Sequence, residues 1–109
     1  MSLSRYRTVW IIALFDLPTR KAEQRKAAAT FRKQLLKEGF TMLQLSVYAR
    51  PCPGEEGARS LKKRLRSNLP AEGHVRLISI TDHQYSRMEV FLSQKKRPVA
   101  EAPSQLELF

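Results

Sequence analysis

The chain has 109 residues and a formal net charge of +10, from 20 lysines and arginines against 10 aspartates and glutamates. This length predicts one domain, with a core small enough for a second copy to add buried surface. A disulfide framework is excluded because Cys52 is the only cysteine, so the expected compartment is the reducing cytoplasm. No stretch approaches the roughly 20 apolar residues of a transmembrane helix.

The excess of positive charge indicates a polyanionic partner. Each phosphate contact releases a counterion, so we predict a nucleic-acid partner and binding that weakens as salt rises. An anionic membrane is the alternative, but no predicted helix combines a basic face with a large aromatic or leucine-rich face. Membrane binding is therefore not expected.

The first predicted element is a strand over the apolar run 9–15, which Asp16 closes. A short, β-branched run indicates a buried strand, and a lone carboxylate is costly to bury, so Asp16 should lie at the open strand end. Arg20 and Lys21 follow a turn at 17–19, so this edge could hold a metal ion and a phosphate together. Alternatively, Asp16 accepts backbone N–H bonds in the turn.

A basic amphipathic helix is predicted next. Thr19 is a fair N-cap, and Gly39 is placed to end the helix. The apolar face consists of Ala28, Phe31 and Leu35. The rest of the helix carries the cations Arg25, Lys26, Arg32, Lys33 and Lys37.

A second basic helix is predicted between the loop at 51–54 and Pro70, which ends it. Its apolar stripe consists of Ala58, Leu61, Leu65 and Leu69. Its other faces carry Arg59, Lys62, Lys63, Arg64 and Arg66. Cations that repel one another without nearby acids favour a polyanion partner, although a solvated face is the alternative.

The pattern over residues 40–50 predicts either one strand or two short strands with a bend near Ser46. In the alternating pattern, Leu43, Leu45 and Val47 share one face, and Gln44, Ser46 and Tyr48 share the other. Another strand is predicted over residues 74–81, and it carries apolar side chains on both faces. Val75 and Leu77 share one face, and Ile78 and Ile80 share the other.

The C-terminal part has weaker signals. Residues 81–84 read as a polar turn, and 88–92 could add a short strand. Residues 95–98 resemble a linker, and 106–109 could pair as an edge strand with another chain. We therefore expect one domain over 1–94 and a linker and edge-strand tail over 95–109.

The order of elements predicts an α+β fold, a ferredoxin-like βαββαβ sandwich whose antiparallel sheet carries two helices on one face. The other face then has no cover. Trp10, Ile12 and Leu14 make it apolar, so we expect a homodimer through this face.

Asp16 is the candidate for chemistry, because zinc-type cysteine and histidine spacing and a glycine-rich phosphate loop are both missing from the sequence. One carboxylate binds Mg²⁺ weakly, but two that converge across a dimer axis could hold a metal that activates water against a phosphodiester. Ser46, Tyr48 and Arg50 could lie nearby and contribute hydroxyls and a guanidinium. Alternatively, they form a packed or solvated strand face.

Four segments together resemble a known family over roughly residues 6–92. They are Phe15-Asp16-Leu17-Pro18, Glu38-Gly39-Phe40, Gln44-Leu45-Ser46-Val47-Tyr48, and Thr81-Asp82-His83-Gln84-Tyr85 ahead of Arg87-Met88. The chain resembles the small CRISPR-associated adaptation protein, second in that system's naming, which partners the CRISPR integrase. It looks most like members from systems with a single large RNA-guided nuclease.

The resemblance implies a ferredoxin-like homodimer with Asp16 of each subunit near the dimer axis. Some members place a divalent metal there and cut RNA or DNA. It also implies a scaffold between integrase dimers that holds spacer DNA. Met42 stands where some nuclease-active members have arginine, which favours binding over cleavage.

The leading hypothesis is a scaffold that binds double-stranded DNA without sequence specificity. Its expected nucleic-acid contacts are Arg20, Lys21, Arg25, Lys26, Arg32, Ser46 and Arg50. The second hypothesis is a Mg²⁺-dependent endonuclease, acting on RNA or DNA, with Asp16 as catalytic residue and metal ligand. A basic ribosome-associated protein is a third alternative.

Overall fold

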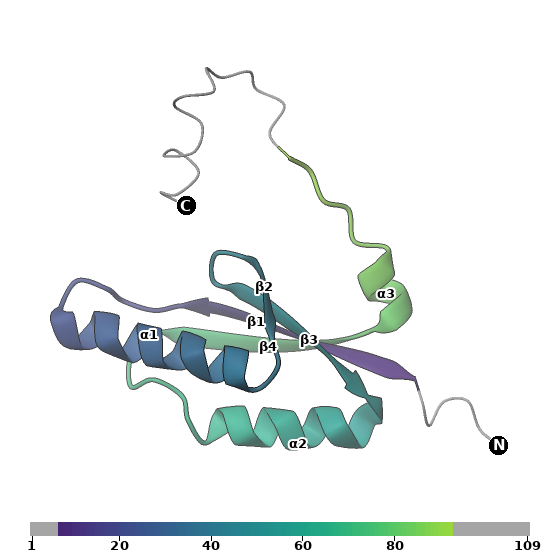
Figure 1. The fold of residues 1–109 in the computed structure, drawn as a ribbon, viewed down its shortest axis with the longest axis horizontal. Coiled ribbons are helices and arrows are strands. Elements are labelled where there is room, and N and C mark those ends of the chain that lie inside the picture. Colours follow the sequence, from purple (N-terminus) through teal and green to yellow (C-terminus); the bar gives the residue numbers. More distant parts are fainter. Residues whose placement is uncertain (1–6, 93–109) are drawn as a thin grey trace.

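A computed structural model describes residues 7–92, which form a sheet with two long helices on one side (Figure 1). The elements are β1 (Thr8–Asp16), α1 (Ala22–Lys37), β2 (Thr41–Gln44), β3 (Val47–Pro53), α2 (Gly54–Arg66), β4 (His74–Thr81) and α3 (Asp82–Ser86). The strands are antiparallel in the order β2-β3-β1-β4. The predicted α+β class and ferredoxin-like order of elements are confirmed.

The core lies between this sheet and the two long helices. Side chains alternate along β1, and its helix-facing set is Val9, Ile11, Ala13 and Phe15. The predicted stripes meet that set: Phe31 and Leu35 come from α1, and Leu61 and Leu65 come from α2. The Phe15 and Phe31 rings meet edge to face, with centroids 5.2 Å apart.

The ends of both helices differ in part from the prediction. α1 begins at Ala22 and not after Thr19, because the Gln24 side-chain oxygen accepts the backbone N–H groups of Arg20 and Lys21. α2 ends at Arg66, so Leu69 lies beyond the helix and is 45% exposed. The predicted role of Gly39 is confirmed, because its φ of 90° lies in the left-handed region that favours glycine.

Of the two alternatives for residues 40–50, the bent pair of strands is the one observed. β2 and β3 are joined by a turn in which Ser46 has a φ of 63°, and the pairing slips between Met42 and Gln44. This irregularity breaks the simple alternation on which the predicted faces depended. Tyr48 is therefore buried in the core at 3% exposure, while Leu45 is 61% exposed.

The sheet face opposite the long helices is largely apolar, as predicted. Ile12 pairs with Ile78, and Trp10 pairs with Ile80. One end of this face carries an unpredicted cover, because the Tyr85 ring of α3 stacks on Trp10 with centroids 3.6 Å apart. The Trp10 indole N–H also donates to Asp82 Oδ1 at 2.7 Å.

The strand proposed over 88–92 is not found, since these residues follow α3 without strand pairing. The predicted tail at 95–109, with its edge strand at 106–109, lies outside the described residues. Within residues 7–92, no helix is long and apolar enough to cross a membrane.

Cys52 is a core residue on β3 with 2% exposure, and burial raises the pKa of its thiol. The thiolate is the reactive form, so both effects slow alkylation. We expect negligible labelling by iodoacetamide in the native protein at neutral pH, and full labelling in concentrated urea. Mass spectrometry measures both, and equal labelling rates in the two conditions would contradict this placement.

Candidate metal and nucleic-acid site

Asp16 is exposed at the end of β1, opposite His74 at the start of β4. Because Phe15 faces the helices, Asp16 lies on the other face of the sheet, together with Leu14. No hydrogen bond or ion pair between residues of the described part of the chain engages its carboxylate. This carboxylate is therefore free to meet a cation or a partner from outside the subunit.

The metal-binding capacity of one chain is small. Across residues 7–92, no group of three or more histidine, cysteine or acidic side chains gathers to hold a metal ion. Mg²⁺ takes oxygen ligands and retains several waters, so one or two carboxylates with substrate phosphate are enough. Asp16 supplies one such carboxylate, and a second copy of the chain could supply another.

Gly73, which the local sequence pattern did not single out, fixes the backbone beside Asp16. It has a φ of 97°, and a Cβ built there would lie 2.6 Å from the Asp16 carbonyl oxygen and 2.8 Å from Leu17 Cδ2. Only glycine allows this close approach without strain. The available signal was a glycine directly before the strand that starts at His74.

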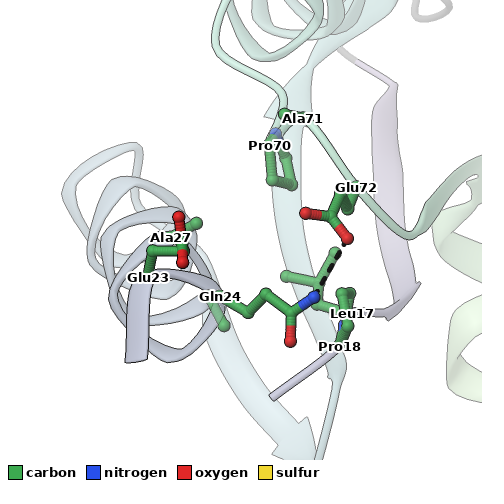
Figure 2. Close-up of a pocket in the computed structure, with 9 residues that line it drawn as sticks. Leu17, Pro18, Glu23, Gln24, Ala27, Pro70, Ala71 and Glu72 are labelled. Atoms are coloured by element: carbon green, nitrogen blue, oxygen red, sulfur yellow. Dashed lines mark hydrogen bonds between the residues drawn. The ribbon is translucent and has the colours of Figure 1, made fainter. Parts of the chain in front are cut away.

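The turn after Asp16 is held by side chains of α1. Figure 2 shows Gln24 reaching across a pocket to Glu72, and its side-chain nitrogen donates to Glu72 Oε1 at 3.0 Å. Arg25 Nη1 donates to the backbone oxygens of Thr19 and Arg20 at 3.0 and 2.8 Å. The start of α1, the turn and the loop before β4 are thereby joined.

The predicted nucleic-acid residues fall into two groups and one outlier. Arg20 and Lys21 are exposed in the turn, while Arg25 uses one guanidinium nitrogen to close it, and Lys26 is exposed one position later. A single hollow is lined by both Arg32 and Ser46.

Arg50 is the outlier, because its partner on β1 is Ile11 and its side chain lies beside Gly39 at the far end of α1. Asp16 lies five positions further along β1 than Ile11, a distance of roughly 16 Å. Arg50 also faces the helices and Asp16 the opposite side, so the structure does not bring these two together. Tyr48, named with Arg50 as a possible contributor, has its ring in the core against Phe15.

The outer faces of both helices carry exposed cations, as predicted. Lys33 and Lys37 are exposed on α1, and Arg59, Lys63 and Arg66 on α2. Between described residues there is one ion pair, in which Arg64 reaches Glu38 at 3.1 Å, and this bond raises the pKa of Arg64. The charge on these faces is therefore hardly neutralised from within the subunit.

Comparison with known proteins points to one family. The family model described as CRISPR associated protein Cas2 matches residues 9–88. The chain is 50% identical over 101 residues to a protein of Parvibaculum lavamentivorans, covering 93% of this chain and 100% of that protein. It is 44% identical over 107 residues to a protein of Flavobacterium psychrophilum, covering 98% and 93%. Both relatives carry the name CRISPR-associated endoribonuclease Cas2.

Replacing Gly73 tests how the Asp16 backbone is held. We expect Gly73→Ala to lower the free energy of unfolding by about 1–3 kcal/mol, because the new Cβ meets backbone at a positive φ. The matched control is Gly57→Ala inside α2, where the nearest atom to the new Cβ is Pro53 Cδ at 3.8 Å. Alanine there should raise stability by roughly 0.5–1 kcal/mol. Urea denaturation measures both, and equal stability of the two variants would refute the account.

Proposed function

The chain belongs to the CRISPR-associated protein Cas2 family, and we propose that it is a homodimeric scaffold that binds double-stranded DNA for the CRISPR integrase. In this role it would serve spacer acquisition in antiviral defence. The observation that supports binding is the row of exposed, unneutralised cations on α1, α2 and the turn at Arg20 and Lys21. Such a surface attracts a polyanion.

We propose that the protein binds duplex DNA through contacts to its phosphates and does not contact the base edges. Lysine and arginine on a helix surface mostly meet the backbone, which positions the duplex but carries no sequence information. A scaffold for spacers of any sequence needs this tolerance. Integrase subunits are the proposed protein partner.

The dimer we propose uses the apolar sheet face. Ile78 is exposed there beside Ile12 and Leu14, and α3 covers only the end at Trp10. Burying an exposed apolar face against a second copy is favourable, and a two-fold arrangement is the commonest closed form. Asp16 lies on this same face, so pairing would bring the two Asp16 residues toward one interface.

A second candidate function is a Mg²⁺-dependent endonuclease that acts on RNA or DNA. It is favoured by the name that the relatives carry, endoribonuclease, and by the free, exposed carboxylate of Asp16. Bound Mg²⁺ would supply charge neutralisation and an activated water. Asp16 of each copy would hold the ion, while Arg20 and Lys21 would orient the phosphodiester by contacts to its oxygens.

Removal of two cations tests the scaffold. We expect the double variant Arg20→Ala, Lys21→Ala to bind duplex DNA more weakly, and the slope of log K against log salt to fall by about 0.9 for each phosphate that is no longer neutralised. The comparison variant, Lys33→Ala with Lys37→Ala, removes the same charge from the other half of α1, a helix about 24 Å long, and measures how much that part of the proposed DNA surface contributes. An unchanged slope in the first variant would exclude these two residues from phosphate binding.

Neutralisation of Asp16 tests the nuclease. If the chain cleaves, we expect Asp16→Asn to reduce the Mg²⁺-dependent rate at least ~100-fold while duplex binding stays at the wild-type level. Glu55→Gln, an exposed acid on α2, serves as the control for the removed charge. Cleavage of labelled RNA and DNA with Mg²⁺ or EDTA is the measurement. Equal rates in wild type and Asp16→Asn would remove Asp16 from any catalytic role.

A further inference from the structure

A hollow lies where α1, the end of β1 and the turn between β2 and β3 meet. Its volume is about 430 Å³, which is within the range of small-ligand sites. Its wall includes Phe15 and Leu17, the two chain neighbours of Asp16, and also Thr19 from the basic turn. The hollow therefore adjoins the candidate site along the chain.

The walls of this hollow include apolar side chains that water reaches. Met42 is 52% exposed and Leu45 is 61% exposed. The turn holds Leu45 there because Ser46 adopts a φ of 63°, a conformation that is unfavourable for a serine. A flat ring that lay with its face against these side chains would remove their apolar surface from water, which is favourable.

The charged group in the wall is the guanidinium of Arg32, which lies with the hydroxyl-bearing side chains of Thr19, Ser46 and Tyr48. Arg32 is half-buried, and nothing else in the stretch 7–92 forms a hydrogen bond or ion pair with it. The half-buried acid Glu38, by contrast, is paired with Arg64. A guanidinium presents several donors in one plane, which suits the oxygens of a phosphate.

We propose that this hollow receives one unpaired nucleobase of a bound strand, with Arg32 on an adjacent phosphate. The base would lie against Met42 and Leu45, and the phosphates that follow would run toward the cations of the turn. This inference rests on the proposed nucleic-acid binding and adds to it a preference for strands with accessible bases. Bases stacked inside a duplex do not reach such a hollow unless they are extruded or frayed.

The test compares two fluorescent single strands of equal length in EDTA, one complete and one with abasic sites at its centre. Both carry the same phosphates, so a difference in affinity reports the base. Burial of one base against the exposed apolar surface of Met42 and Leu45 predicts about tenfold tighter binding of the complete strand. Fluorescence anisotropy gives both affinities and their salt dependence.

Three variants separate the parts of the hollow. The double variant Met42→Ser, Leu45→Ser should remove the preference for the complete strand and keep the salt dependence, because it changes no charge. Arg32→Gln should weaken the binding of both single strands and lower the salt slope by about 0.7. Leu69→Ser, at an exposed apolar residue that does not line this hollow, is the control and should behave as wild type.

The outcomes distinguish this inference from the proposed function. Equal, salt-dependent binding of both strands by the wild type would overturn the base site and leave nucleic-acid binding intact. No binding of either strand or of duplex DNA would overturn both. A preference that survives in the Met42, Leu45 double variant would also overturn the assignment to this hollow, provided that circular dichroism shows a native fold.

Discussion

The central strand β1 is the constraint on which the rest of the structure depends. It pairs with β3 on one edge and β4 on the other, so its register sets the whole sheet. Its alternation directs Phe15 into the helix-covered core and Asp16 to the opposite face. The core and the candidate site are therefore neighbours in sequence but lie on different sides of one sheet.

The positive surface charge of the molecule comes from the helix faces that do not pack into the core. Each long helix buries one apolar stripe and turns lysines and arginines outward, and the acid Glu38 neutralises only Arg64 among them. Self-repulsion of this kind opposes compact folding and is relieved by a bound polyanion. The surface that makes the isolated subunit less stable is thus the surface that we propose for DNA.

Much of this structure could be predicted from sequence, because the long elements have clear periodicity. The strand at His74–Thr81, the stripe of Phe31 and Leu35, and the exposed end position of Asp16 all follow from local pattern. Contacts distant in sequence could not be predicted. Gly73 against the Asp16 carbonyl and Tyr85 on Trp10 exist only once the sheet has formed.

The measurement that tests the central claim most directly is the number of wild-type chains bound to each duplex DNA molecule. Analytical ultracentrifugation at a series of salt concentrations gives this stoichiometry. The account predicts two chains on each duplex, with or without Mg²⁺, and an affinity that falls steeply as salt rises. A complex with one chain per duplex, or no complex at low salt, would contradict the proposed dimeric scaffold.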